Sequence, residues 1–227
     1  MSSKIYPIGI QNFESLRKDG YFYIDKTALI YQMVKTGRYY FLSRPRRFGK
    51  SLMISTLEAY FQGKKELFED LAMEKLEKDW IKHPILHLDL NIGKYDTPDS
   101  LDKILNEALL NWEILYGTGP GEVTLALRFK GVVKRACEQT GQRVAILVDE
   151  YDKPLLQAIG NEALQKEYRN TLKPFYGVLK TMDGCIKFAI LTGVTKFGKV
   201  SVFSDLNNLI DISMDERYVS LCGVTGQ

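Results

Sequence analysis

The hydrophobic pattern of the chain consists of short, continuous apolar runs separated by longer stretches in which apolar residues recur with helical spacing. Two of the runs, at residues 144–148 and 186–191, consist almost entirely of apolar side chains. Runs of this length predict strands that are buried on both faces. Three further short apolar segments predict additional strands, at residues 38–42, 85–90 and 209–213.

Amphipathic segments lie between the predicted strands. The first is expected to be a helix that begins after Asp25, its predicted N-cap. Pro174 should bend or divide the last helix. The other helices are expected at residues 51–62, 64–82, 101–115, 122–140 and 161–182. Strands that alternate with helices in this way predict an α/β fold, with a parallel sheet covered on both faces by right-handed crossovers.

Composition and charge are typical of a globular protein and do not indicate a binding partner. The chain has 227 residues, enough for one sizeable α/β domain, with 45% apolar and 26% charged residues. A net charge of +3 is too small to indicate nucleic acid or membrane binding by itself. We expect no membrane interaction and a cytoplasmic location, because no apolar run is long enough to span a bilayer.

The cysteines and histidines predict neither a disulfide framework nor a metal centre. Cys137, Cys185 and Cys222 are far apart and lack C-x-x-C spacing, which is typical of reduced, incidental thiols. His83 and His87 have the spacing of a helical metal pair, but a proline lies between them and the second falls in a predicted strand. Structural or surface roles are therefore favoured for both histidines.

The segment after the first predicted strand has the layout of a phosphate-binding loop. Residues 43–51 read SRPRRFGKS and precede a predicted helix. In such a loop, backbone N–H groups and the positive end of the helix face an anion. Lys50 would reach the β- and γ-phosphates, and the Ser51 hydroxyl would bind Mg²⁺. Arg44 stands where the usual pattern has its first glycine, so the loop must turn differently there.

Polar residues that follow two other strands predict the rest of a nucleotide site. Asp149 and Glu150 come directly after the apolar run at 144–148, and Thr192 ends the run at 186–191. Ligands of parallel sheets bind beyond the carboxyl ends of the strands, where all three residues should meet the loop. Asp149 would hold Mg²⁺ beside Ser51, and Glu150 could polarise a water for attack on the γ-phosphate. Thr192 could orient that water or simply bond to the backbone, and both interpretations stay open.

Seven segments together resemble the predicted AAA-ATPase family of bacteria. They are residues 8–13 (IGIQNF), 23–27 (YIDKT), 44–52 (RPRRFGKSL), 149–152 (DEYD), 192–197 (TGVTKF), 206–209 (LNNL) and 221–223 (LCG). The resemblance covers nearly the whole chain. It implies a P-loop NTPase three-layer sandwich with a mainly parallel five-stranded sheet in the order 5-1-4-3-2. It also implies that an arginine at position 44 is the family's own form of the loop.

The resemblance and the motifs together give a full set of expectations. The catalytic residues are Lys50, Glu150 and Thr192, the metal ligands are Ser51 and Asp149, and the cofactors are ATP and Mg²⁺. The ATP-binding residues are expected to be Arg44, Pro45, Arg46, Arg47, Phe48, Gly49, Lys50, Ser51 and Leu52. Residues 1–227 are expected to form one nucleotide-binding domain, with residues 1–37 as an N-terminal extension packed on it. Family members commonly continue into a helical lid and a PD-(D/E)XK nuclease-like domain, and we expect neither within these residues.

Three functions remain open at this point. The first is an ATPase whose hydrolysis drives or gates an attached effector, such as a nuclease-type domain. The second is a switch that binds ATP without appreciable hydrolysis, which the Arg44 loop favours. The third is a nucleic-acid-binding module whose basic cluster at residues 44–50 contacts DNA, although the acids Asp149 and Glu150 would repel phosphates in the absence of Mg²⁺. Whether protomers form a homo-oligomer also stays open.

Overall fold

The computed structural model describes residues 5–7, 9–196, 202–204, 206 and 208–223. Five strands form a single sheet in which every pairing is parallel, in the order β2-β3-β4-β1-β5. The strands are β1 (Tyr39–Ser43), β2 (Ile85–Asp89), β3 (Val144–Asp149), β4 (Ile186–Gly193) and β5 (Ile210–Asp211). This order confirms the predicted 5-1-4-3-2 arrangement, read from the opposite edge of the sheet.

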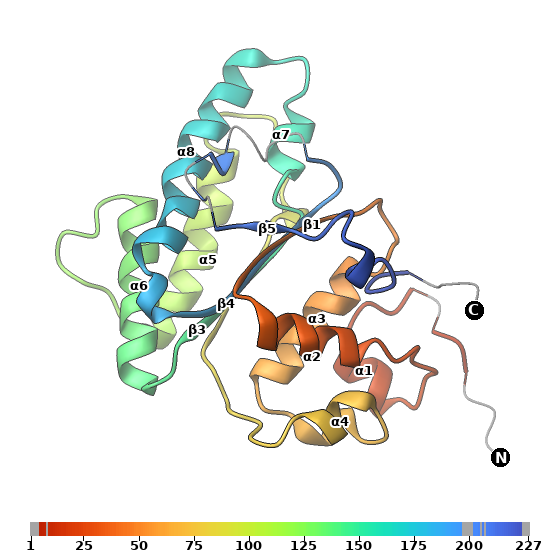
Figure 1. Ribbon diagram of the computed structural model, residues 1–227. Helices are drawn as coiled ribbons and strands as arrows, with labels where there is room; N and C mark the ends of the chain where they lie inside the picture. The colour runs from red at the N-terminus through yellow and green to blue at the C-terminus, as the bar shows by residue number, and fades with distance from the viewer. Residues whose placement is uncertain (1–4, 8, 197–201, 205, 207, 224–227) are drawn as a thin grey trace.

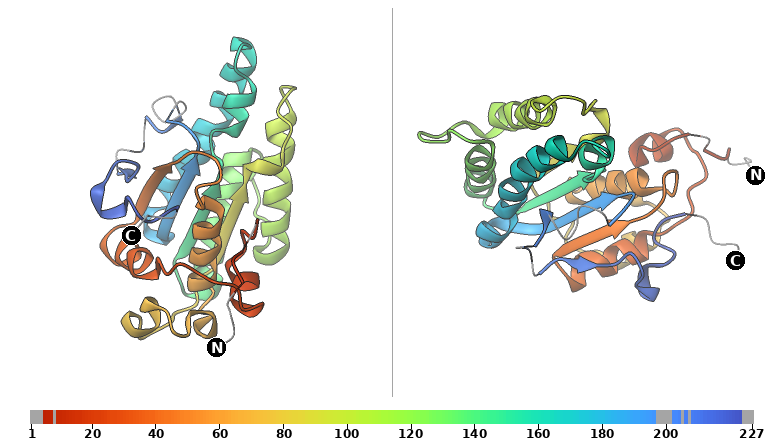
Figure 2. Two further views of the ribbon diagram at one scale, coloured as in Figure 1. Left: turned by 90° about the vertical axis from the view of Figure 1, so that its right-hand side faces the viewer. Right: turned by 90° about the horizontal axis from the view of Figure 1, so that it is seen from above.

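The helices lie in two layers, one on each face of the sheet, as the views in Figures 1 and 2 show. One layer holds α1 (Phe13–Lys18), α2 (Thr27–Thr36), α3 (Lys50–Phe61) and α4 (Ala72–Leu76). The other holds α5 (Ser100–Tyr116), α6 (Leu125–Thr140), α7 (Lys153–Gln157) and α8 (Glu162–Thr181). Short 3-10 turns connect these elements: η1 (Lys65–Phe68), η2 (Leu90–Ile92), η3 (Asp183–Cys185) and η4 (Glu216–Tyr218).

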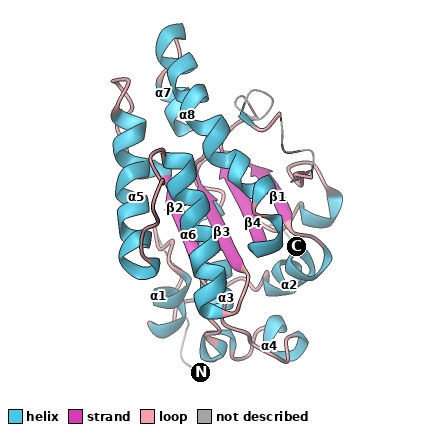
Figure 3. Ribbon diagram, turned by 90° about the vertical axis from the view of Figure 1, so that its left-hand side faces the viewer, coloured by secondary structure: helices cyan, strands magenta, loops and turns pink. Residues whose placement is uncertain are grey.

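The central strands are buried on both faces because each face packs against a separate apolar cluster. Alternate side chains of β3 and β4 enter different clusters: Ile146 and Leu191 face α5, α6 and α8, whereas Leu147 and Ile190 face α2 and α3. All six residues of β3 are buried. The continuous apolar run at residues 144–148 thus forms a parallel strand between two helical layers, as predicted. Figure 3 shows these strands between the helices.

The N-terminal helices share the core of the loop-bearing helix α3. Phe13 of α1 and Ile30 of α2 are buried in the same cluster as Met53 and Leu57 of α3. The backbone N–H of Phe13 also donates to the Ser55 hydroxyl of α3, at 2.8 Å. These contacts fix the segment that precedes β1 against the helix that follows the phosphate loop.

Three local expectations differ from the structure. Residues 64–82 contain only η1 and the short helix α4 rather than one long helix. Helix α8 runs through Pro174 as a single element, so the expected division into two helices does not occur. The N-cap of α2 is Lys26 and not Asp25. One carboxylate oxygen of Asp25 accepts from the backbone N–H and the hydroxyl of Thr27. The other oxygen accepts from the Ala72 N–H. Asp25 therefore ties α2 to α4.

No helix in the part of the chain that the structure describes has the length and apolar character needed to cross a bilayer.

Replacement of Ile190 by Ala tests the two-sided packing of the sheet. Ile190 is fully buried, and its loss should lower the free energy of unfolding by about 2–5 kcal/mol, since it removes apolar contacts and leaves a cavity. Ile159→Ala is the matched control, because that side chain is 62% exposed and should change stability by about 0.5 kcal/mol or less. Denaturant unfolding measures both variants, and equal effects would contradict the packing described.

Candidate functional site

The carboxyl ends of the strands bring the predicted site residues to one edge of the sheet. Ser43 at the end of β1 is in register with Gly193 at the end of β4, and Asp89 of β2 is in register with Asp149 of β3. The chain segments that follow β1, β3 and β4 therefore leave the sheet side by side. This is the edge at which parallel α/β sheets bind ligands.

The phosphate loop turns through two residues with left-handed backbone conformation. Arg47 has a φ of 65°, and Gly49, the N-cap of α3, has a φ of 79°. The second is the glycine of the motif, and only glycine adopts this conformation without steric cost. The sequence predicted that an unusual turn would follow from Arg44, but the left-handed non-glycine residue is Arg47. Strained backbone of this kind is concentrated at ligand sites.

Lys50 lies inside the loop and is almost entirely buried, with 4% of its surface exposed. Its ammonium donates to the Arg44 carbonyl at 3.0 Å and to the Pro45 carbonyl at 3.3 Å. The same ammonium forms an ion pair with the Glu150 carboxylate, Nζ to Oε1, at 3.2 Å. Two carbonyls of the loop and the carboxylate of Glu150, which follows β3, thus surround the Lys50 ammonium.

Asp149 joins the loop helix to two strands. One oxygen of its carboxylate accepts from the Ser51 hydroxyl at 2.6 Å, and the other accepts from the Thr192 hydroxyl at 2.5 Å. Both Asp149 and Thr192 are buried, and Thr192 is fully so. The Thr192 hydroxyl also lies 3.4 Å from the Val148 carbonyl, which is the backbone bond of one of the two interpretations. Its shorter bond to Asp149, which positions that carboxylate, was anticipated by neither.

The oxygen atoms of Ser51 and Asp149 fit a hard divalent cation. Mg²⁺ prefers a small number of protein oxygen ligands and completes its shell with water and phosphate oxygens. A hydroxyl and a carboxylate oxygen that already lie 2.6 Å apart can both turn toward such an ion. Among the described residues, no three His, Cys, Asp or Glu side chains gather in a way that would hold a metal by themselves. A cation here would therefore depend on ligand phosphates.

Glu150 follows Asp149 in a left-handed conformation, with a φ of 57°, which turns its side chain toward Lys50. Burial raises the pKa of its carboxyl above the ordinary value, and the charges of Asp149 and Asp152 act in the same direction. The Lys50 ammonium opposes this shift without cancelling it. A raised pKa brings a carboxylate closer to the range in which it accepts a proton effectively at neutral pH.

Arg44 and Pro45 do not line either of the two cavities described below. The Arg44 guanidinium donates to the Ser213 carbonyl beyond β5 and to the Ser43 carbonyl. Its backbone N–H donates to the Gly193 carbonyl, at 3.1 Å. In this conformation Arg44 joins the ends of β1, β4 and the segment after β5. Direct contact of Arg44 or Pro45 with a nucleotide stays a prediction.

Asp152 is a buried residue of this edge to which sequence reasoning gave no role. Its carboxylate accepts from the backbone N–H of Val194 at 3.2 Å and of Thr195 at 2.7 Å, and from the Thr195 hydroxyl at 2.8 Å. It lies so close to Gly193 that a Cβ there would stand 2.6 Å from Oδ1. The only signal in the sequence was the presence of Asp152 in the DEYD motif. An acid three residues after Asp149 does not by itself indicate which groups it contacts, so no role could be assigned to it.

A polar cavity of about 820 Å³ opens over the phosphate loop. The loop contributes Arg46, Arg47, Gly49, Lys50 and Ser51 to its lining, and α3 also contributes Leu52. The rest of its lining consists of Glu150 and of residues outside the predicted set, namely Gly9, Ile10, Gln11, Asn91, Lys153 and Gln157. Seven of the predicted site residues thus line one cavity. Asp149 and Thr192 do not line it, but Asp149 bonds to the lining residue Ser51 and Thr192 bonds to Asp149.

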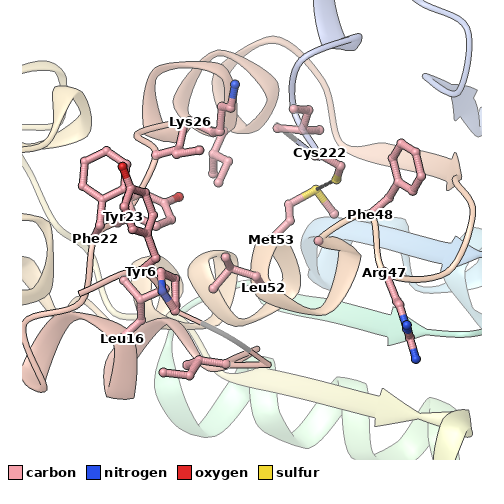
Figure 4. Close-up of a pocket in the computed structure, with 17 residues that line it drawn as sticks. Tyr6, Leu16, Phe22, Tyr23, Lys26, Arg47, Phe48, Leu52, Met53 and Cys222 are labelled. Carbon is pink, nitrogen blue, oxygen red and sulfur yellow. Dashed lines mark hydrogen bonds between the residues drawn. The ribbon is translucent and has the colours of Figure 1, made fainter. Parts of the chain in front are cut away.

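An apolar cavity of about 380 Å³ lies next to the polar one and shares Ile10, Arg47, Gly49 and Leu52 with it. Its other walls come from the N-terminal segment, from α3 and from residues near the end of the described chain. Figure 4 shows Tyr6, Phe22 and Tyr23 on one side and Phe48, Met53 and Cys222 on the other. Burial raises the pKa of the Cys222 thiol to about 11, which favours the protonated form of this lining residue.

Some residues that carry the family resemblance cannot be placed. Ile8, Phe197 and Asn207 lie outside the described residues. Phe13 belongs to the core under α3, whereas Gly9, Ile10 and Gln11 line the polar cavity.

Comparison with known proteins gives one family and one curated relative. The family model described as predicted AAA-ATPase matches residues 7–203. A protein from Azotobacter chroococcum mcd 1, described as an uncharacterized protein in the vnfD 5' region, is 43% identical over 227 residues. The alignment covers 99% of this chain and 44% of the relative, so the chain spans less than half of the relative's length. No solved structure matches the chain.

Replacement of Asp152 by Ala tests whether this carboxylate organises the segment after β4. The variant leaves the Val194 and Thr195 N–H groups without their charged acceptor, which should lower the free energy of unfolding by about 2–4 kcal/mol. Asp102→Ala is the control, because its exposed carboxylate accepts one hydrogen bond, from Thr171, and should change stability by about 0.5 kcal/mol or less. Thermal and denaturant unfolding measure both. A loss at Asp152 no larger than that at Asp102 would refute the role.

Proposed function

The chain belongs to the predicted AAA-ATPase family, and from that premise we propose that it binds Mg²⁺–ATP at the loop of residues 44–52 and hydrolyses it to ADP and phosphate. Family membership supports nucleotide binding. The observation that carries the proposal is Lys50, a buried ammonium that the loop carbonyls aim into a cavity lined by Ser51 and Glu150. A buried cation with a hydroxyl and a helix N-terminus beside it is complementary to a phosphate chain.

The shapes of the two cavities support a nucleotide in one orientation. The polar cavity of about 820 Å³ would take the phosphates, where Lys50, Arg46 and Arg47 supply positive charge. The adjoining apolar cavity of about 380 Å³ would take the purine base, between Tyr6 and Phe22 on one side and Leu52 on the other. Aromatic and aliphatic side chains recognise the flat face of a base mainly by burial and stacking.

The Lys50–Glu150 ion pair has a direct consequence for binding. The Lys50 ammonium has three protons, and the Arg44 carbonyl, the Pro45 carbonyl and Glu150 accept all of them. A phosphate oxygen must therefore take the place of at least one acceptor. We propose that it replaces Glu150, since a carboxylate and a phosphate compete for the same cation while the two carbonyls hold the lysine in the loop.

Hydrolysis would then use the carboxylate that binding releases. Glu150 would accept a proton from water while the water oxygen bonds to the γ-phosphorus and the bond from that phosphorus to the bridging oxygen of ADP breaks. Its raised pKa suits this role. Ser51 and Asp149 would hold the Mg²⁺, which when bound offsets negative charge on the phosphate oxygens. Thr192 would act through Asp149, whose carboxylate it orients.

We also propose that turnover drives or gates an effector. Less than half of the curated relative is matched, so a nucleotide-binding module that serves further sequence is consistent with this family. A nuclease-type domain, DNA or a second protomer could receive the signal. The exposed guanidinium groups of Arg46 and Arg47 face the cavity and are available to contact nucleotide or partner.

Replacement of Lys50 by Ala tests nucleotide binding. The affinity for Mg²⁺–ATP should fall by about 100-fold or more, because charge-assisted hydrogen bonds contribute about 1.5–3 kcal/mol each and 1.4 kcal/mol corresponds to about tenfold. Lys166→Ala removes an exposed lysine of α8 and should leave the affinity unchanged. Calorimetric titration measures both, with unfolding curves to verify that the variant is folded. Unchanged ATP affinity, together with salt-dependent DNA binding that survives the substitution, would favour a nucleic-acid-binding module.

Replacement of Glu150 by Gln separates an ATPase from a switch that only binds. The amide cannot take the proton of the attacking water, so steady-state phosphate release should fall by about 100-fold or more while ATP affinity is kept or improved. Loss of the ion pair with Lys50 is the reason for expecting improved affinity. Glu162→Gln, on the surface of α8, is the control. Phosphate release that is unaltered by the Glu150 substitution would remove this residue from catalysis, and a wild-type protein that binds ATP without turnover would be the switch.

A further inference from the structure

The lining of the polar cavity includes a second lysine, which lies outside the phosphate loop. Lys153, the first residue of α7, lines this cavity together with Lys50, Ser51 and Glu150. It was not among the residues that the sequence predicted for the site. Its backbone is fixed within the same turn as Glu150, because the Lys153 N–H donates to the Glu150 carbonyl at 3.0 Å.

The Lys153 side chain is half-buried and held at its head by one residue of another element. Its ammonium donates to the backbone carbonyl of Asn91 in η2 and to the Asn91 side-chain oxygen, the latter at 2.7 Å. Asn91 lines the same cavity. The two residues thus place a cationic head on the cavity wall at a defined position, from segments that follow β2 and β3.

The two lysines differ in what balances their charge. Lys50 is paired with the Glu150 carboxylate, at 3.2 Å. Lys153 bonds to neutral carbonyl and amide oxygens, and no carboxylate in the described part of the chain lies within ion-pair distance of it. Among the described residues, the lining of the cavity includes four cationic side chains, Arg46, Arg47, Lys50 and Lys153, and one carboxylate, that of Glu150. This excess of positive charge is complementary to a polyanion.

We propose that Lys153 contacts the terminal phosphate of the bound nucleotide in addition to Lys50, and that it makes the site prefer a triphosphate to a diphosphate. The inference rests on the proposed function, since it names a further contact of the same ligand. The ammonium exchanges its neutral Asn91 acceptors for charged phosphate oxygens, a change that strengthens its hydrogen bonds. No covalent bond of Lys153 forms or breaks. Because Lys153 and Glu150 share one turn, this contact also holds Glu150 near the γ-phosphorus.

The alternative is that Lys153 only ties α7 to η2 through Asn91. In that case the loss of Lys153 would loosen both segments. The affinities for ATP and ADP would then fall by the same factor, or both would stay unchanged. A contact with the terminal phosphate instead affects ATP alone. The ratio of the two affinities therefore separates the two roles, and overall stability does not.

The test uses Lys153→Met, which keeps most of the apolar stem and removes the charge. Calorimetric titration with Mg²⁺ compares ADP with a non-hydrolysable ATP analogue in the wild-type protein and the variant. We expect the affinity for the ATP analogue to fall by about 10- to 100-fold, as for the loss of one charge-assisted hydrogen bond, and the affinity for ADP to stay within about twofold. Lys153→Arg should restore part of the preference for the triphosphate.

Two control variants make the outcome specific. Asn91→Ala removes the side-chain anchor of Lys153 but keeps the charge, so the preference for the ATP analogue should persist. Lys166→Met on α8 should alter neither affinity. An unchanged affinity ratio in Lys153→Met, or a wild-type protein that binds ADP and the ATP analogue equally, would overturn this inference while nucleotide binding stands. A wild-type protein that binds neither nucleotide would overturn the proposed function itself.

Discussion

The candidate site depends on one carboxylate, that of Asp149, which is bonded on both of its oxygens. Ser51 brings the first turn of α3 to it, and Thr192 brings the end of β4. Asp149 itself ends β3, so a single side chain sets the relative position of two strands and the helix that follows the phosphate loop. Lys50 is the first residue of that helix, so the same contact helps to place its backbone, while the Arg44 and Pro45 carbonyls orient its ammonium. A change at Asp149 would therefore displace the loop as well as remove a proposed metal ligand.

Two further contacts join segments at the edge of the sheet around this carboxylate. Asp152 holds the backbone at Val194 and Thr195, and Arg44 holds the segment after β5 through the Ser213 carbonyl. Each contact joins segments that are far apart in sequence but leave neighbouring strands at the same end. A phosphate site needs such support, because backbone N–H groups bind an anion well only when the loop that carries them is already in place.

Much of the fold could be predicted because parallel strands buried on both faces leave continuous apolar runs, as at residues 144–148 and 186–191. The strand order came from the family resemblance and not from periodicity. Lys50, Ser51 and Glu150 could be placed together because strand ends meet at one edge. Three contacts could not be predicted: the pairing of Glu150 with Lys50, the hydrogen bonds of Lys153 to Asn91, and those of the Asp152 carboxylate. Each depends on loop conformations and long-range side-chain contacts that leave no periodic signal in the sequence. Residues 64–82 were wrongly expected to be one long helix, because helical composition is a weak guide where tertiary contacts decide.

The ion pair between Lys50 and Glu150 gives the proposed binding step an electrostatic consequence. Burial already raises the pKa of the Glu150 carboxyl, and the Lys50 ammonium opposes that rise. A nucleotide that takes over the ammonium would withdraw this opposition, whereas the Mg²⁺ proposed to accompany it would supply a new positive charge beside Asp149. Ligand uptake would thus exchange one cationic neighbour of Glu150 for another, which would keep the carboxyl ionised for its proposed role as a base.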